Sequence, residues 1–573
     1  MILLRRVCRV GAIVGFVWLA GCSAGGTERP VGLNSNPPTL VENLPDLSQP
    51  PSGDAWGHAG RGNKVLYLFS QRSVGQQDPQ VLEFSDAVLI RGWQRWQREG
   101  LAAGDYDFDY PARARARGID FVAGGTASVV FSDENPALFE RWITRDALGE
   151  SVEHTEILPG AYRATLANPS YREHLIAFAK LQIDGGVDGL FFDEVNGGGF
   201  NGGPKWQYNG NEGFDDHFLA AFNAYLLDKH PGFGSSDWVS RYGMSLENQP
   251  RKDLPPGDLA RNFNYRRYLA ERGLARDPMN ARNPLLRLWG QIEGNREHLE
   301  ADNFREKAFD WYWRDIVTQL REYARSRYGK EIQITSNGLF RYVDFNSFGL
   351  YPYNADYEGR EVDWVPVKAG RLDGTRSYQA EFKALYKRNQ QVSGDVPLVL
   401  FLDWPTEMMN RYYSLSAAEK MDFWRIYAAE AYANGLFFAF HLRTSMPDEP
   451  SASESGILDF LKTYTRFYVD HADLYLKTHP VEAKIELGLP LVSASLTEGQ
   501  GGKVLHLVNH NYASGLKPQA NFGVSLPLSA PPKSVKLHSP DGSSRSLVFQ
   551  YADGKLSLQV DQLVSYDAIV IDQ

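Results

Sequence analysis

The chain has 573 residues and a formal net charge of −10, from 60 Lys and Arg against 70 Asp and Glu. A chain of this length builds far more than a marginal core and points to two or more domains. The acidic balance and the lack of basic clusters argue against nucleic acid as a partner. The only two cysteines, Cys8 and Cys22, lie near the N-terminus, so the rest of the chain is expected to have no disulfide and no thiolate metal site.

The N-terminal segment has the features of an export signal. Three arginines, Arg5, Arg6 and Arg9, precede a short apolar run over residues 10–19. The run ends in "LAGC", residues 19–22, which resembles the lipobox of bacterial lipoproteins. The resemblance implies a signal peptide over residues 1–21, lipidation of Cys22, and attachment through more than one acyl chain. The alternative is an ordinary secretory signal.

The lipobox resemblance also indicates a location. Ser23 follows the cysteine, which in that family favours the outer membrane. We therefore expect a lipid-anchored protein of the bacterial cell envelope, on the periplasmic or surface face of the outer membrane. Residues 22–59 are rich in Pro, Ser, Gly and Asn without apolar periodicity, which predicts a flexible tether.

Short apolar runs alternate with helical stretches over residues 60–478, the pattern of βα units and a parallel sheet. Eight strands are predicted, at residues 65–69, 87–90, 119–123, 187–193, 332–336, 343–348, 397–403 and 436–440. Helices are predicted between most of them, at residues 169–182, 304–328, 378–389 and 417–433. The pattern predicts an α/β fold, a (β/α)8 TIM barrel, with a long insertion over residues 196–302 after strand four. The alternative, an open doubly wound sheet, lacks its phosphate-binding glycine loop.

The hydrophobic period changes after a closing helix over residues 456–476. Short alternating segments such as "GKVLHLVNH" and "YDAIVID" are separated by the turns "GQGG", "SPDG" and "ADG". We expect a small C-terminal antiparallel β-sandwich over residues 479–573.

In a TIM barrel the active site lies at the C-terminal ends of the strands. The stretch "VDGLFFDEVNGGG" brings an apolar strand to that face and ends it with two acids, Asp193 and Glu194. Strand alternation places Asp193 on one face of the sheet and Glu194 on the other. The glycines that follow let the backbone turn away and leave room for a substrate. Asp193 is therefore the first candidate for catalysis, against the alternative of a helix cap or a structural ion pair.

Residues 166–195, "LANPSYREHLIAFAKLQIDGGVDGLFFDEV", resemble a segment of barrel glycoside hydrolases of the α-amylase, dextranase and α-galactosidase type. In that family an Asn-Pro-x-Tyr-Arg helix precedes a Gly-x-Asp-Gly-aromatic-x-x-Asp strand whose last Asp is the nucleophile. The matching residue is Asp193, whereas Leu190 stands where the aromatic residue is usual. The resemblance implies glycoside hydrolysis, and the C-terminal domain resembles the β-domain that follows such barrels.

Glycoside hydrolysis requires a second carboxyl group. Glu358, in the tyrosine-rich stretch after strand six, is the first candidate for the acid/base, and Asp403 at the end of strand seven is the second. Asp356 and Glu361 remain possible. A retaining mechanism is expected; it requires a separation of about 5–5.5 Å from Asp193, whereas about 6.5–9.5 Å would indicate inversion.

Polar and aromatic residues at the other strand ends are candidates for binding sugar. Aromatic residues make up 13% of the chain, and Trp364 and Trp206 are two further tryptophans flanked by polar residues that suit a pyranose face. The predicted substrate-binding residues are Arg91, Trp93, Glu194, Asn337, Tyr351, Asp403, Trp404 and His441. Among these, Asn337, Arg91 and His441 would bind hydroxyls or orient the nucleophile, and for each of the three alone a role in satisfying the loop backbone is the competing interpretation.

No metal or cofactor is predicted. The sequence has no His-Glu-x-x-His motif, and His506 and His510, four residues apart on a predicted strand, would lie roughly 13 Å apart. A Gly-x-Ser-x-Gly elbow is also absent from the sequence, which argues against a serine hydrolase. The main alternative function is a non-catalytic carbohydrate-binding lipoprotein on the same barrel. A deacetylase or lyase ranks third, because the sequence lacks the His-Asp metal cluster that a deacetylase needs.

Overall fold

The computed structural model describes residues 62–70, 79–92, 109–132, 136–153, 160–193, 195, 212–245, 262–290, 303–350, 354–355, 361–364, 366–402, 407–442 and 456–573, without the side chains of residues 79, 80, 91, 92, 126, 137, 354, 355, 361, 407–410 and 441. The predicted signal peptide, tether and lipidation site at Cys22 lie outside this range. Within it, no helix combines the length and apolar character that a membrane span requires.

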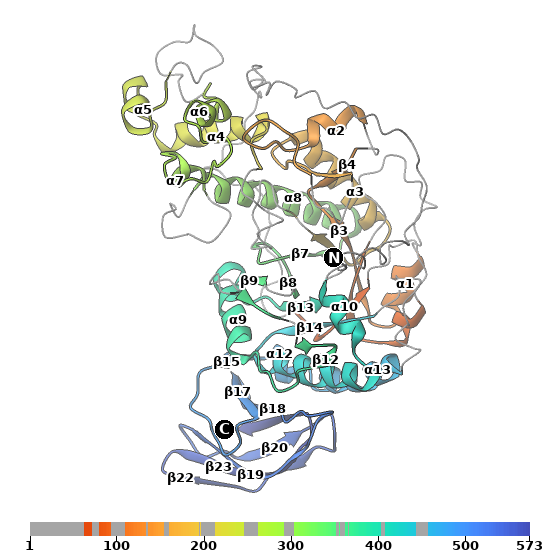
Figure 1. Ribbon diagram of the computed structural model, residues 1–573. Helices are drawn as coiled ribbons and strands as arrows, with labels where there is room; N and C mark the ends of the chain where they lie inside the picture. The colour runs from red at the N-terminus through yellow and green to blue at the C-terminus, as the bar shows by residue number, and fades with distance from the viewer. Residues whose placement is uncertain are drawn as a thin grey trace, which may run out of the picture.

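Eight parallel strands close into a barrel in which each strand lies beside the next along the chain, and the last pairs with the first (Figure 1). The barrel strands are β1 (Leu66–Ser70), β2 (Ala87–Gly92), β3 (Asp120–Thr126), β6 (Gly189–Asp193), β7 (Gln333–Asn337), β8 (Phe345–Leu350), β13 (Leu398–Leu402) and β14 (Phe437–His441). All eight correspond to predicted strands, so the predicted (β/α)8 barrel is confirmed.

Aromatic rings fill the interior of the barrel. In β1, the ring of Tyr67 lies 5.3 Å from that of Phe345 in β8 and 5.6 Å from that of Phe437 in β14. Two residues further along β1, Phe69 stacks on Phe401 of β13 at 4.9 Å. Each fully buried ring of this kind stabilises the fold by roughly 1.5–3 kcal/mol. The interior is therefore a packed core, which leaves the strand ends as the place for a site.

Helices and short turns surround the barrel. They are η1 (Pro79–Glu83), α1 (Asp109–Arg115), α2 (Pro136–Trp142), α3 (Pro169–Asp184), α8 (Phe304–Tyr328), α9 (Gln379–Ser393), α10 (Glu407–Ser414), α11 (Ala417–Phe423), the π-helix η5 (Trp424–Ala428), α12 (Ala429–Ala433), α13 (Ile457–Asp470) and α14 (Asp473–Leu476). The longest, α8, begins at the N-cap Asn303 and ends at Gly329, whose φ of 62° favours glycine. The described connection from β7 to β8 contains no helix, which departs from an ideal (β/α)8 barrel.

The predicted insertion between the fourth and fifth barrel strands forms its own helical layer. It contains α4 (Asp216–Lys229), α5 (Ser235–Tyr242), α6 (Tyr265–Glu271) and α7 (Leu286–Trp289). Trp289 is fully buried there and stacks on Phe214 at 4.9 Å, with Phe222 edge-on at 4.8 Å. This aromatic core fixes the helices against the start of α8, because Phe304 also packs on Trp289.

The C-terminal domain consists of two antiparallel sheets that share an apolar core, as predicted. The first sheet contains β15 (Thr478–Val481), β17 (Val492–Gly499), β18 (Gly502–Asn509), β24 (Tyr566–Asp572), β20 (Ser534–His538) and β21 (Arg545–Ser546). The second contains β16 (Glu486–Leu487), β19 (Gln519–Pro527), β23 (Lys555–Leu563) and β22 (Phe549–Ala552). This β-domain lies at the end of the molecule opposite α4–α7 (Figure 1).

The central strand β18 joins the β-domain to the barrel by strict alternation. Leu505 and Leu507 point into the core of the β-domain, whereas Val504 and Val508 belong to the core of the barrel and its helices. His506 is buried on the same side as the valines, with Nδ1 2.7 Å from the Tyr566 hydroxyl and Nε2 3.0 Å from that of Thr497. The two domains therefore share one continuous buried interface.

Two buried titratable groups of the β-domain act on stability in opposite directions. Burial lowers the pKa of His506 to about 3, so unfolding becomes easier as pH falls from about 6.5 towards 3. Burial also raises the pKa of Asp567 to about 7, with Asp541 adding to the shift against the opposing effects of Ser539 and Arg545. The contribution of protonated Asp567 is present at acid pH and is lost as pH rises from about 4 through 7.

We expect the variant Asp567→Asn to be more stable than the wild type at pH 8 by more than about 1 kcal/mol, and equally stable at pH 4. The amide removes the cost of ionising a buried group and matches the neutral acid in shape. Urea unfolding at both pH values measures the difference. The control is Asp553→Asn, at an exposed turn position whose positive φ of 52° Asn accommodates, and it should show no pH-dependent gain. A stabilisation by Asp567→Asn that is equal at both pH values would contradict the prediction.

Candidate active site

The ends of three neighbouring strands define the best-described part of the catalytic face. Asp193 is the last residue of β6, Asn337 the last of β7, and Gly349 lies near the end of β8. In β6 the residue before Asp193, Phe192, points outwards and meets the ring of Trp313 in α8 edge-on at 5.5 Å. Alternation therefore points Asp193 inwards, towards the mouth of the barrel.

Asp193 is held at both its backbone and its side chain. Its carbonyl oxygen accepts a hydrogen bond from the Ala127 N–H at 2.6 Å, just after β3. Its Oδ1 accepts one from the Nδ2 of Asn337 at 3.1 Å. The carboxylate is half-buried, so these contacts fix its orientation without removing it from the face of the barrel.

Asn337 connects three strands through one amide. It donates to Asp193 in β6, and its Oδ1 accepts from the backbone N–H of Gly349 in β8 at 3.3 Å. Both ends of the amide are thus assigned, since the acceptor oxygen faces an N–H and the donor nitrogen faces a carboxylate. Asn337 was predicted to bind sugar hydroxyls or to orient the nucleophile, and its hydrogen bond to Asp193 is consistent with the second of these roles.

The helix α3, which carries the Asn-Pro-Ser-Tyr-Arg motif, holds Ala127, the residue that is hydrogen-bonded to the backbone of Asp193. Asn168 caps α3 by accepting from Ser170 N at 2.9 Å, and Pro169 occupies the first turn. The buried Tyr171 then donates its hydroxyl to the carbonyl oxygen of Ala127 at 2.7 Å. Because Ala127 N–H bonds to Asp193, the motif connects α3 to the backbone of the candidate nucleophile. The sequence contained the motif, but this role requires the three-dimensional contact.

Gly124 of β3 allows the neighbouring strand β6 to pack closely just before Asp193. Gly124 of β3 pairs in register with Phe191, and a Cβ at Gly124 would collide with the Phe191 side chain and carbonyl. The missing side chain therefore lets the Phe191 ring lie across β3, two residues before Asp193.

The segment after β8 contains the first candidate for the second acid. Two short antiparallel strands, β9 (Asn354–Ala355) and β10 (Glu361–Val362), flank Glu358 in the chain. Asp363 follows β10, and its Oδ1 lies 3.2 Å from the Nη1 of Arg411 in α10, the helix after β13. This ion pair joins the segment that holds Glu358 to the one that follows Asp403, and it was not predicted.

Trp364 corrects one expectation from the sequence. It was expected to offer its ring to a sugar, but only 2% of it is exposed. Its ring stacks on Tyr378 at 5.9 Å and on Phe382 of α9 at 6.2 Å, and it meets Phe348 of β8 edge-on. Trp364 is thus a core residue that fastens the β10 strand to α9.

The other predicted site residues are placed only along the chain. Arg91 lies at the end of β2 and His441 at the end of β14, both on the predicted face, with side chains outside the described residues. The remaining ones, Trp93, Glu194, Tyr351, Glu358, Asp403 and Trp404, together with Asp356 and Trp206, lie outside the described residues altogether. In the part of the chain that is described, no three His, Cys, Asp or Glu side chains could together hold a metal ion.

The closed parallel barrel and the β-domain after it define a (β/α)8 fold with a C-terminal antiparallel β-domain. Solved structures of carbohydrate-active enzymes share this fold. The chain is similar to a cycloisomaltooligosaccharide glucanotransferase from a Paenibacillus species, with 9% identity, a TM-score of 0.50, and coverage of 88% of this chain and 84% of that one. It is also similar to α-L-fucosidase isoenzyme 2 from Paenibacillus thiaminolyticus, with 8% identity, a TM-score of 0.50, and coverage of 89% and 100%.

At these identities the likeness concerns the fold. No protein-family model matches the sequence, and no curated protein matches it significantly.

Proposed function

We propose that the protein is a glycoside hydrolase with Asp193 as its nucleophile, acting on a poly- or oligosaccharide at the bacterial cell envelope. The observation that carries the proposal is the inward carboxylate of Asp193 at the end of β6, fixed by Asn337 and Ala127 in a barrel of the glycosidase type.

The proposed reaction retains the anomeric configuration. A carboxylate oxygen of Asp193 attacks the anomeric carbon while the bond to the leaving oxygen breaks, and the acid/base gives that oxygen a proton. A water molecule then attacks the glycosyl-enzyme ester, giving its proton back to the acid/base and freeing Asp193. Asn337 holds the carboxylate in one orientation through both steps, which favours a near-attack geometry. Glu358 is the proposed acid/base, and Asp403 is the alternative.

The test is to incubate the purified wild-type protein with a panel of sugars and measure hydrolysis. The panel includes α-glucans, isomalto-oligosaccharides and aryl α-L-fucosides, of which the last two correspond to the glucanotransferase and the fucosidase that share the fold. We expect release of reducing sugar from at least one of them. Proton NMR of the first product should show the anomer of the substrate. An inverted anomer would overturn the retaining mechanism, and binding without cleavage of any bound glycan would favour a non-catalytic carbohydrate-binding protein.

The proposed location rests on the lipobox-like residues around Cys22. We expect Cys22→Ala to abolish lipidation, because the thiol that would accept the diacylglycerol is lost. Labelling cells with a palmitate analogue and separating membrane from soluble fractions would measure this. The wild type should be labelled and sediment with the membrane, whereas Cys22→Ala should be unlabelled. A control, Ser23→Ala, should keep the label, and unchanged fractionation of Cys22→Ala would defeat the proposal.

A further inference from the structure

The chain between β8 and α9 contains a second hairpin, formed by β11 (Val367–Lys368) and β12 (Arg371–Leu372). We call residues 366–378, which include this hairpin and its flanks, the β11–β12 segment. Its backbone is held by three side chains of the continuous helix α11–η5–α12. The buried Glu419 accepts from Arg371 Nε at 2.7 Å and from Leu372 N at 3.3 Å. Tyr427, on the π-helical turn, donates to the carbonyl oxygen of Asp373 at 2.8 Å.

The third of these side chains is Glu430 of α12, which is fully buried. Its carboxylate accepts hydrogen bonds from the Ser377 hydroxyl and, at 2.8 Å, from the backbone N–H of Tyr378. A buried carboxylate lowers stability unless its oxygens are hydrogen-bonded or paired with a cation. The position of Ser377 and Tyr378 therefore depends on how Glu430 is held.

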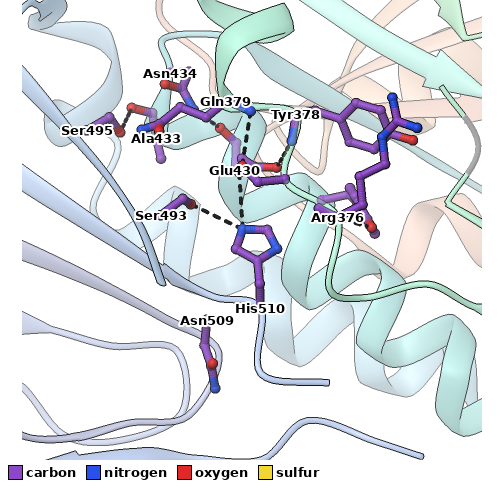
Figure 2. A network of polar contacts seen from close by, with 12 residues as sticks. Arg376, Tyr378, Gln379, Glu430, Ala433, Asn434, Ser493, Ser495, Asn509 and His510 are labelled. Carbon is purple, nitrogen blue, oxygen red and sulfur yellow. Dashed lines mark hydrogen bonds and ion pairs between the residues drawn. The ribbon is translucent and has the colours of Figure 1, made fainter. Parts of the chain in front are cut away.

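The β-domain supplies the group that holds Glu430. His510, just after β18, places its Nε2 3.1 Å from Oε1 of Glu430, and His510 is itself 2% exposed. Figure 2 shows Glu430 between Tyr378 on one side and His510 on the other, with Ser493 of β17 next to the imidazole. Glu430 and Ser493 contact the same ring nitrogen of His510, so the three residues do not form a catalytic triad.

A second contact from the β-domain reaches the same segment. Tyr512 lies against Gly374, where a Cβ would come within 2.5 Å of its ring. Gly374 thus provides the space that the Tyr512 ring fills. Two residues of one β-domain loop, His510 and Tyr512, therefore hold the β11–β12 segment at two places.

The β11–β12 segment is in turn connected to the candidate active site. Tyr378 stacks on Trp364 and donates its hydroxyl to the carbonyl oxygen of Asp363 at 2.6 Å. Asp363 and Trp364 directly follow β10, one of the two strands that flank Glu358. A series of contacts therefore connects the β-domain, through Glu430 and Tyr378, to Asp363 and Trp364 just after β10.

We propose that the C-terminal β-domain positions the β11–β12 segment and, through Tyr378, the residues Asp363 and Trp364 that follow β10, with His510 and Tyr512 as positioning residues. The inference rests on the proposed function in that it takes Glu358 as the acid/base. The β-domain then contributes to turnover without touching substrate, since small displacements of a catalytic group are costly to the rate.

The experiment compares His510→Ala, His510→Gln and a matched control, Ser495→Ala, in the full-length protein. Ser495 of β17 is also buried in the interface and donates to Ala433 O at 2.6 Å, outside the β11–β12 segment. Hydrogen–deuterium exchange is measured for peptides covering residues 366–378 and for peptides of β1 and β2. We expect His510→Ala to raise exchange in residues 366–378 by about tenfold. Exchange in β1 and β2 should not change, Ser495→Ala should leave residues 366–378 protected, and His510→Gln, whose amide can still donate, should restore protection.

Kinetics on any sugar that the wild type hydrolyses give the second measurement. His510→Ala should lower kcat by about 10- to 100-fold, and His510→Gln should recover most of it. Should His510→Ala fail to fold, Tyr512→Ala has the same expected results. Equal exchange in residues 366–378 for His510→Ala and Ser495→Ala overturns the inference even where the wild type is active. If exchange in residues 366–378 rises only in His510→Ala and the wild type hydrolyses no sugar, the positioning role of the β-domain is supported and the proposed function is refuted.

Discussion

Asp193→Asn is expected to lower kcat by about three orders of magnitude or more while the protein stays folded. The amide has the shape of the carboxylate, and its oxygen can still accept the hydrogen bond that Asn337 donates. It lacks the negative charge that attacks the anomeric carbon, so the glycosyl-enzyme ester cannot form. Initial rates on the best sugar of the panel measure the effect, and far-ultraviolet circular dichroism with urea unfolding checks the fold.

Asp188→Asn is the matched control for this variant. Asp188 belongs to the same stretch of sequence but precedes β6, where it pairs with Arg115 at 2.7 Å and accepts from Phe121 N at 3.0 Å. Losing those contacts should reduce stability and leave kcat close to the wild-type value. Azide added to Asp193→Ala should restore turnover and yield a glycosyl azide of inverted configuration, because the anion replaces the missing nucleophile. Hydrolysis by Asp193→Asn at a near-normal rate would refute the role of Asp193.

The second large effect concerns a buried ion pair at the opposite ends of the same strands. Arg321 of α8 donates through Nη2 to Oδ2 of Asp344 at 2.8 Å, and the two side chains are 2% and 7% exposed. Asp344 also accepts from the backbone N–H of Ile334 in β7 at 2.6 Å. We expect Asp344→Ala to reduce the free energy of unfolding by about 3–5 kcal/mol, because it leaves a guanidinium buried without its counter-charge. Urea unfolding of the full-length protein measures it.

An exposed pair provides the comparison. Asp470 pairs with Arg466 one helical turn away in α13 at 2.8 Å, with both side chains about half exposed, so Asp470→Ala should cost about 0–1 kcal/mol. The double variant Arg321→Met, Asp344→Leu should recover much of the loss, since both charges of this pair are then removed together. A loss for Asp344→Ala no greater than that for Asp470→Ala would contradict the buried-pair argument.

The sequence by itself determined the architecture. Apolar runs such as that of residues 187–193, separated by helical segments, specified parallel strands, because a strand covered on both faces must be apolar throughout. Period-2 alternation in β18 and β24 specified the C-terminal sheets for the same reason of burial. Asp193 could be chosen from the sequence because a carboxylate that ends an apolar strand is a local anomaly, and the position of strand ends in a barrel is a general rule.

Only the tertiary structure decided which partners these residues have. Asn337 is distant from Asp193 in sequence, and its role as a positioning residue depends on the pairing of β6 with β7. Trp364 seemed suited to sugar by its polar neighbours, yet Tyr378 and Phe382 bury it. The sequence placed His510 too far from His506 to share a metal ion, but it gave no sign that His510 contacts Glu430, 80 residues earlier. Periodicity reports which face of an element is buried, but hydrogen bonds and ring contacts depend on distances between elements that the chain brings together only on folding.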